Sequence, residues 1–273
     1  MLGLGNGLVS AGFIDSEINH SLFFDGTNDE VDYTTSGFQT ALNAANGNFK
    51  VSGSVSIWAR FENTSSNGQV WDFAINTSNR IQLQYKQSTD SLTFTFKGNA
   101  GSKTQATAVY DPGAGLEDDS TFHHILCTWD KGEEEMKLYV DGSLRATSSI
   151  EDVTINGDFD DTADGTLGEA GSGGVEFLSG TSFTGAADLH AYLDDFAVYS
   201  TVLNSTSATN LYNSGKSNPA DVATVQEGII AHWKFNEGSG TTVTDAVNGY
   251  VGTLGDVASG DAPSFSTTNA EGV

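Results

Sequence analysis

Oxygen-bearing side chains that could bind a cation stand at two separate places in this sequence. Asn28 and Asp29 lie in an Asp-Gly-Thr-Asn-Asp turn, and Asp194 and Asp195 lie in a strand-like run. Calcium prefers several hard oxygen ligands from carboxylates, amides and backbone carbonyls. These four residues are therefore the candidate calcium site. In the alternative, Asp25 and Asp29 accept hydrogen bonds within their own turn, and Asp194 accepts them from neighbouring backbone amides.

A second acidic segment, Asp160 to Gly165, has oxygen side chains at alternate positions and a glycine at the sixth. This spacing matches the start of an EF-hand calcium loop. Gly171 stands at the twelfth position, where that loop needs a bidentate glutamate, and neither flank has a helical pattern. We therefore expect a solvated loop.

The adjacent histidines His123 and His124 precede the single cysteine, Cys127, in one largely apolar run. Neighbouring residues of a strand point to opposite faces, so these two imidazoles would not form a compact metal pair. Apolar surroundings also favour the thiol over the reactive thiolate. We expect structural histidines, and a cysteine that packs as a small hydrophobic residue.

The carboxylates do not show the pattern of a glycoside hydrolase. Such an enzyme needs two carboxylates that flank the scissile bond. Glu133-Glu134-Glu135 is a charge run beside a turn, and Asp194 and Asp195 would face opposite sides of a strand. The sequence therefore predicts a protein without catalytic residues, with a polysaccharide-active enzyme as one alternative.

Sugar binding is the remaining chemistry that the residue types suggest. Trp71, Tyr85 and Tyr110 could stack on the apolar faces of sugars beside polar loop groups. They are the candidate glycan-binding residues. The alternative for each of them is a place in the hydrophobic core.

The net charge limits the partners of the chain. It has 36 Asp and Glu against 11 Lys and Arg, a formal charge of −25 at pH 7. Such a charge repels nucleic-acid phosphates and anionic membranes, so we exclude nucleic-acid binding. The charge suits a protein dispersed in a salty medium, with bound cations as the alternative. The first residues contain no basic region and no sustained apolar run, so we expect no signal peptide and no membrane insertion.

The elements that must position these residues are strands. Short aromatic-containing runs separated by glycine-rich turns are typical of a β-protein. We expect strands within 22–33, 51–59, 70–75, 81–85, 92–96, 122–129, 136–140 and 190–199, with the cleanest alternation in 81–85 and 92–96. Asn204 or Ser205 can cap a short helix that Gly215 ends. The predicted fold class is all-β, a two-sheet antiparallel jelly-roll sandwich with one short helix near 204–213.

The domain organisation depends on the segment Trp233-Lys234-Phe235-Asn236-Glu237-Gly238-Ser239-Gly240. It has the pattern of a hairpin, and a hairpin alone is marginally stable in water. We expect an N-terminal arm at 1–20, a jelly roll at 21–215, a linker at 216–227, and C-terminal strands at 228–273 that complete the same sandwich or a neighbouring subunit's. A second, truncated domain is the alternative, but it would leave Trp233 without a core.

Several separate motifs resemble the laminin-G-like and pentraxin-like branch of the concanavalin A-type jelly rolls. They include Leu22-Phe23-Phe24-Asp25-Gly26, Phe122-His123-His124-Ile125, Leu138-Tyr139-Val140-Asp141-Gly142 and Leu193-Asp194-Asp195-Phe196-Ala197-Val198-Tyr199. In that family the Trp-Lys-Phe type of segment usually precedes the Phe-Asp-Gly turn, whereas here it follows the domain. The resemblance implies a sandwich fold, and it implies that calcium can bind near such loops.

The resemblance and the residues together give three functional hypotheses. The first is a non-enzymatic virion or surface structural protein, assembled in the host cytoplasm and serving assembly, adhesion or glycan contact. The Tyr-Asn-Ser-Gly run at 212–215 and the Trp-Lys-Phe run at 233–235 resemble segments of structural proteins of marine tailed phages. The partners of such a protein would be other virion or surface proteins, further copies of the chain, or a cell-surface glycan. The second is a free, extracellular, calcium-dependent lectin, and the third is the polysaccharide-active enzyme.

Overall fold

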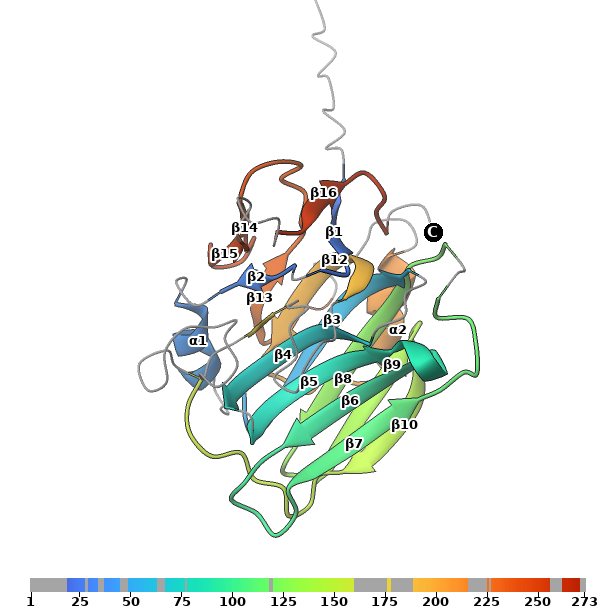
Figure 1. Cartoon of the computed structure of the whole chain (residues 1–273). Coiled ribbons are helices and arrows are strands. Elements are labelled where there is room, and N and C mark those ends of the chain that lie inside the picture. The colour runs from blue at the N-terminus through green and yellow to red at the C-terminus, as the bar shows by residue number, and fades with distance from the viewer. Residues whose placement is uncertain are drawn as a thin grey trace, which may run out of the picture.

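The chain folds mainly into β-strands. The computed structural model describes residues 19–27, 29–33, 37–44, 49–62, 67–76, 78–117, 120–159, 176–177, 189–215, 225, 227–255 and 262–270. Within these residues two larger antiparallel sheets pack face to face, beside a small third sheet (Figure 1). The predicted all-β jelly-roll sandwich is confirmed.

The larger sheet has eight strands, and seven of them lie in the order β10 (Ser143–Ser149), β9 (Glu135–Val140), β8 (His123–Asp130), β3 (Ser52–Phe61), β12 (His190–Tyr199), β1 (Ser21–Asp25) and β16 (Ser264–Ser266). The eighth, β13 (Ile229–Trp233), pairs with the second half of β12, whereas β1 pairs with the first half. Strands from the two ends of the chain therefore lie along the same side of β12.

The second sheet has the order β4 (Gly68–Asn76), β5 (Asn79–Lys86), β6 (Ser91–Lys97) and β7 (Gln105–Tyr110), and we call it the β4–β7 sheet. A short 3-10 turn, η2 (Gln87–Thr89), connects β5 to β6. The small sheet has the order β11 (Glu176–Phe177), β2 (Val31–Asp32), β15 (Val251–Leu254) and β14 (Thr242–Thr244).

The main core fills the space between the two larger sheets. Alternate residues of each strand face inward, and many of these are aromatic. Phe73 of β4 stacks on Phe196 of β12 with ring centroids 6.5 Å apart, and the ring of Phe94 of β6 lies 6.2 Å from that of Trp129 of β8. These contacts fix the β4–β7 sheet against the larger sheet and leave its other face outward.

Two helices lie outside the sheets. α2 (Ser205–Gly215) begins where predicted, since the Asn204 side chain accepts a hydrogen bond from the Ser207 amide at 3.0 Å. It covers a second apolar cluster, which includes Trp58 and Tyr199, on the outer face of the larger sheet. α1 (Phe38–Ala44) was not predicted, because its seven residues give one buried pair, Phe38 and Leu42, and no acidic residue in the first turn.

The C-terminal segment contributes strands to these same sheets. Trp233 is fully buried, and its ring lies 4.3 Å from Tyr33 and 5.6 Å from Phe196 between centroids. β16 pairs with β1, and β15 pairs with β2. Residues 1–18 of the predicted arm (1–20) and most of the predicted linker, 216–224 and 226, lie outside the described residues.

Candidate functional site

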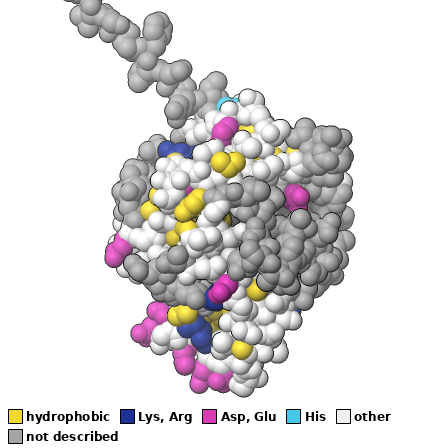
Figure 2. Space-filling view, turned by 90° about the vertical axis from the view of Figure 1, so that its left-hand side faces the viewer, with side chains coloured by type: hydrophobic (Ala, Val, Ile, Leu, Met, Phe, Trp, Pro, Cys, Tyr) yellow, Lys and Arg dark blue, Asp and Glu magenta, His cyan; other side chains and the backbone are white. Residues whose placement is uncertain are grey.

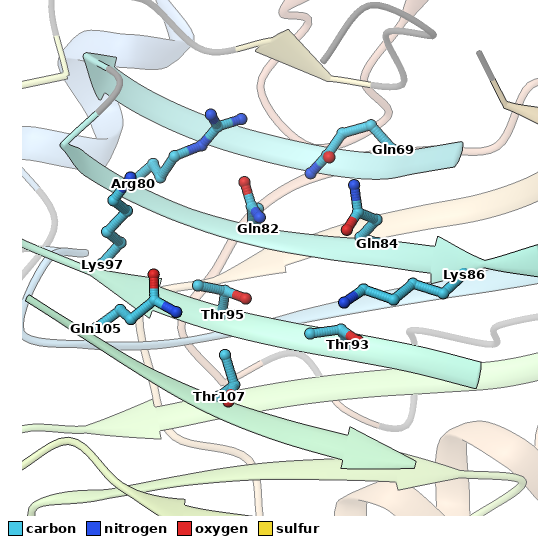
Figure 3. Close-up of a pocket in the computed structure, with 10 residues that line it drawn as sticks. All are labelled: Gln69, Arg80, Gln82, Gln84, Lys86, Thr93, Thr95, Lys97, Gln105 and Thr107. Carbon is cyan, nitrogen blue, oxygen red and sulfur yellow. The ribbon is translucent and has the colours of Figure 1, made fainter. Parts of the chain in front are cut away.

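A groove lined by polar side chains runs over the outer face of the β4–β7 sheet, and we call it the polar groove (Figure 3). Its volume is about 230 Å³, below the range of roughly 300–1,000 Å³ for pockets that enclose a small molecule. A ligand would therefore lie along the groove rather than inside it. The described residues that line it are Gln69, Arg80, Gln82, Gln84, Lys86, Thr93, Thr95, Lys97, Gln105 and Thr107.

Strand alternation in β5 and β6 produces this surface. Inward-facing residues such as Leu83 are fully buried, so the residues between them project from the opposite face. The pairing register then places Gln84 beside Thr93 and Gln82 beside Thr95. Rows of amides and hydroxyls thus cross the sheet, and each can donate or accept hydrogen bonds.

The charged residues of the polar groove stand toward its ends. Arg80 is 4% exposed and forms an ion pair with Asp72, which is 1% exposed. Its Nε also donates to Asp72 Oδ1 at 3.2 Å, so the guanidinium is held in one orientation. Lys97 is the cross-strand neighbour of Arg80. Lys86 extends along the sheet toward Thr93, as Figure 3 shows.

The three aromatic residues expected to bind glycan face the other way. Trp71 is 0% exposed and Tyr85 is 1% exposed, so neither ring offers a face to a sugar, and for these two the expectation of exposed rings is wrong. Both side chains point to the inner face of their strands, as those of Phe73 in β4 and Leu83 in β5 do. Tyr110 is half-buried against the core, and Arg145 lies over its ring at 5.3 Å.

Tyr85 has a structural role at one end of the β4–β7 sheet. Its hydroxyl lies 3.0 Å from Asp90 Oδ1 and 2.9 Å from Glu117 Oε2. Burial, followed by these hydrogen bonds with Glu117 and Asp90, raises the pKa of Tyr85 far above its ordinary value. Asp90 also accepts hydrogen bonds from the amides of Leu116 and Glu117, so this cluster anchors the loop after β7.

Among the described candidate calcium ligands, Asp29, Asp194 and Asp195 belong to no cluster of three metal-binding side chains. Asp29 accepts a hydrogen bond from the Asp25 amide at 2.6 Å. This is the alternative to calcium binding, in which the acidic residues form hydrogen bonds within their own turn. The Asp194 carboxylate accepts hydrogen bonds from the amides of Asp195 and Ala270, each at 2.9 Å. Within the described part of the chain, no three His, Cys, Asp or Glu residues are grouped to hold a metal ion. Asn28 and the 160–165 segment lie outside that part.

Asp195 has a different partner. It lies at a register shift of β12, with φ at 47°, and its Oδ1 is 2.9 Å from His232 Nε2. This contact joins β12 to the neighbouring strand β13 through side chains. The pair is buried, so it braces the C-terminal strand rather than facing a solvent-exposed site.

The two adjacent histidines contact different partners. His124 is buried, and its Nε2 lies 2.9 Å from Ser56 Oγ. Burial lowers its pKa to about 4, against a smaller opposing effect of Asp141. His123 Nδ1 lies 2.8 Å from Asp141 Oδ2. A Ser-His pair is the geometry of an activated nucleophile, but Ser56 has no exposed surface through which a substrate could reach it.

Cys127 is fully buried in the main core, and burial raises the pKa of its thiol well above the ordinary value. It therefore stays a protonated thiol among apolar neighbours at neutral pH. The interpretation of Cys127 as a small core residue agrees with this position.

Sequence reasoning missed the residues of the polar groove. The signal was present, since Gln82, Gln84 and Lys86 alternate with core residues in β5, as Thr93, Thr95 and Lys97 do in β6. That alternation identified the strands. It could not show that the polar positions of four strands would meet on one surface, because strand order and register come from tertiary pairing.

Acidic side chains outnumber basic ones on one side of the described molecule (Figure 2). Figure 2 shows one side of the molecule, on which Asp and Glu lie at several places and Lys and Arg are fewer. Among the described helices, none is long and apolar enough to span a bilayer.

Three solved structures show what the chain is similar to, and the first of them supports the fold. A Bacteroides ovatus protein that has been ascribed a carbohydrate-binding role aligns with a TM-score of 0.58 and 14% identity, over 91% of this chain and 59% of that one. A heptameric SAP-like pentraxin from Limulus polyphemus aligns with a TM-score of 0.47 and 13% identity, over 72% of this chain and 82% of that one. Domains LG4-5 of the mouse laminin alpha1 chain align with a TM-score of 0.44 and 15% identity, over 66% of this chain and 40% of that one.

At such identities the likeness concerns the fold alone, and the chain spans less than two thirds of the length of the first of these structures. No curated protein matches the sequence. A family model does match, described as the concanavalin A-like lectin/glucanases superfamily, and it covers residues 25–208, more than half of the chain. The chain therefore belongs to the concanavalin A-like lectin/glucanases superfamily.

Proposed function

We propose that this chain is a non-enzymatic carbohydrate-binding protein whose sugar site is the polar groove. The observation that carries the proposal is the continuous row of amides and hydroxyls across β4 to β7, in which Gln82 and Gln84 are partly exposed. Sugars present many hydroxyls that both donate and accept, and Gln and Thr side chains match that chemistry. The membership in a lectin and glucanase superfamily supports a carbohydrate ligand by analogy of fold.

The lining of the polar groove favours binding over hydrolysis. Glycoside hydrolases place two carboxylates on either side of the scissile bond, roughly 5–9.5 Å apart. None of the ten described residues that line the groove is Asp or Glu. Asp72, beside the groove, is buried in its ion pair with Arg80. Incubation with algal and bacterial polysaccharides should therefore release no new reducing ends, and a measurable release would contradict this part of the proposal.

We further propose that the protein works at the surface of a virion or a cell, where it serves assembly, adhesion or glycan contact. The similarity to structural proteins of marine tailed phages, and a charge of −25 that keeps a protein dispersed in salt, support this setting. Size-exclusion chromatography with light scattering, and mass spectrometry of intact particles, test it. A chain that is monomeric and absent from particles would contradict the assembly role without affecting the sugar site.

The sugar site is tested with a glycan array and a pair of matched variants. Gln82→Ala/Gln84→Ala removes two amides from the polar groove. Ser143→Ala/Thr147→Ala removes two exposed hydroxyls from β10, on the other sheet. We expect the wild type and the β10 variant to bind the same glycans, and the groove variant to lose most of this binding. Equal binding by all three proteins would overturn the assignment of the site.

Calcium is a separate proposal, based on the resemblance and on the ligands Asn28, Asp29, Asp194 and Asp195. The array repeated with a chelator distinguishes a calcium-dependent lectin from one that binds through the polar groove alone. Since the polar groove needs no cation, we expect chelation to leave binding there unchanged. Binding that requires calcium and is insensitive to Gln82→Ala/Gln84→Ala would favour a sugar site at the candidate calcium ligands instead.

A further inference from the structure

The charged residues that line the polar groove are all basic. They are Arg80, Lys86 and Lys97, and none of the described residues that line the groove is acidic. The whole chain has only 11 Lys and Arg against 36 Asp and Glu. The carboxylate of Asp72 pairs with Arg80. The described lining of the groove is thus basic, whereas the whole chain is acidic.

Protection of a sheet edge does not explain these lysines. Lysines on edge strands prevent aggregation by blocking further strand pairing. Lys86 and Lys97 belong to β5 and β6, which are the two central strands of the β4–β7 sheet, and β4 and β7 flank them. Their place over the middle of the sheet points to a ligand on its face.

The lining contains no aromatic ring among its ten described residues. Aromatic side chains present large rigid faces to neutral ligands in many binding sites. Here the contact energy has to come from hydrogen bonds and charge. Charge-assisted hydrogen bonds are about twice as strong as neutral ones, so an anionic ligand gains most from this lining.

The basic residues are spread along the groove. Arg80 and Lys97 are cross-strand neighbours near one end. Lys86 lies six residues further along β5, a separation of about 20 Å between Cα atoms. Neutral Gln and Thr side chains occupy the space between them. A single acidic sugar would reach only one of these ends, whereas an extended chain would span both.

We propose that the polar groove binds an extended acidic polysaccharide, whose sugar units carry carboxylate or sulfate groups; this rests on the proposed carbohydrate-binding function. The acidic groups meet Lys86 at one end and Lys97, beside the Arg80–Asp72 pair, at the other, and the sugar hydroxyls meet the Gln and Thr rows. The net charge of −25 opposes the approach of any polyanion, but this repulsion is screened beyond about 8 Å at physiological ionic strength. The local cations act at contact and are screened less.

Isothermal titration calorimetry with defined oligosaccharides tests the proposal. The probes are an oligo-uronate, a sulfated oligo-galactan, a neutral β-glucan of equal length, the uronate monosaccharide, and single-stranded DNA. Lys86→Gln/Lys97→Gln removes two charges from the groove, and Lys103→Gln/Lys234→Gln removes two exposed lysines that do not line it. We expect at least one acidic oligosaccharide to bind about tenfold tighter than the neutral glucan and the monosaccharide.

The groove variant should lose about tenfold in affinity for that acidic oligosaccharide, and the control variant should match the wild type. The uronate and sulfate probes tell which anionic group is recognised. A preference for the neutral glucan, sensitive to Gln82→Ala/Gln84→Ala, would overturn this inference and leave the sugar site standing. Equal losses of affinity in both lysine variants, or DNA binding as tight as oligosaccharide binding, would show that non-specific charge attraction causes the binding. Either result would overturn this inference. Binding that ignores every groove variant would overturn both proposals.

Discussion

Asp194 connects two parts of the chain that are far apart in sequence. Its side chain accepts one hydrogen bond from the amide of the adjacent Asp195 and one from the amide of Ala270, each at 2.9 Å. The carboxylate is 2% exposed, so these backbone groups have little access to water. Hydrogen bonds to a buried carboxylate are among the stronger ones in proteins. The residue therefore holds the C-terminal segment against β12.

Replacing this carboxylate should destabilise the fold without any involvement of calcium. We expect Asp194→Ala to lower the free energy of unfolding by roughly 1.5–3 kcal/mol, because two amides lose a charged acceptor. Urea unfolding with calcium and with a chelator measures the effect. A loss that appears only with calcium, or a wild type that calcium stabilises and the variant does not, would instead make Asp194 a metal ligand.

His124 should make the stability of the protein depend on pH. Its folded pKa is about 4, below the ordinary value of 6.5, because burial disfavours the charged imidazole. Below pH 6.5 the unfolded chain binds a proton that the folded chain does not bind, so stability falls between pH 6.5 and about 4, and above pH 6.5 this residue has no effect. His124→Asn should remove about 2 kcal/mol of the loss between pH 7.5 and pH 5.

Urea unfolding of both proteins at the two pH values isolates this effect, since every other titrating group is common to them. The same loss of stability in wild type and variant would show that His124 does not carry it.

At the residue scale the sequence predicted chemistry better than orientation. The hydrogen bond of Asp29 within its own turn and the apolar place of Cys127 follow from local pattern, and the structure has both. Trp71 and Tyr85 were candidates for sugar stacking because aromatic residues suit either a core or a site. Only the pairing of β4 and β5 with their neighbours decides which face is buried.

Among the elements, β13 has the largest consequence for packing. It continues the line of β1 along β12 and carries Trp233 into the main core. The Trp233 ring meets Phe38 edge to face at 5.0 Å, and its Nε1 donates to the Tyr250 carbonyl at 3.2 Å. A strand near the C-terminus thus fills a space between elements from the first half of the chain.

Removal of the Trp233 ring should be costly. Trp233→Ala leaves a cavity among aromatic neighbours, and such changes usually cost 3–5 kcal/mol. Val247, which is 43% exposed, provides the control, and Val247→Ala should change stability by less than about 0.5 kcal/mol. Chemical denaturation monitored by tryptophan fluorescence and by circular dichroism measures both. A Trp233→Ala protein as stable as Val247→Ala would mean that this segment is not part of the core.

Periodicity predicted most of the long strands, but it missed β7 and β10 and the shortest elements. β5 and β6 have strict alternation, and the helix after β12 has a cap and a terminal glycine, so local sequence is enough to place them. α1 has seven residues and β11 has two, and such short elements give no detectable periodic pattern. Their positions depend on what packs against them.

For the whole molecule, the excess of acidic residues should make stability sensitive to salt. A charge of −25 on one chain destabilises the compact state through self-repulsion. The screening length shortens from about 30 Å at 0.01 M salt to about 3 Å at 1 M. We therefore expect the thermal midpoint to rise by several degrees between these conditions, and to rise alike in sodium chloride and choline chloride. A midpoint that does not change with salt would contradict this effect of net charge.

At the scale of the whole molecule, the sequence predicted the sandwich where family motifs and strand patterns occur. The family model covers residues 25–208, and the strand pattern over that range indicates the sandwich. The place of residues 229–266 follows from the need to bury Trp233, but their partners β1, β2 and β12 are seen only in the structure. The polar groove is likewise seen only in the structure, because four strands contribute to it and the sequence of any one strand does not identify it.

The most direct test of the sugar site is a nuclear magnetic resonance titration of the side-chain amides with an oligosaccharide selected on the array. Gln82, Gln84 and Gln105 line the polar groove, and Gln87 in the η2 turn does not. We predict that the amide signals of the first three shift with a common affinity while that of Gln87 stays in place. Shifts confined to residues outside the groove, with these three unchanged, would contradict the central claim.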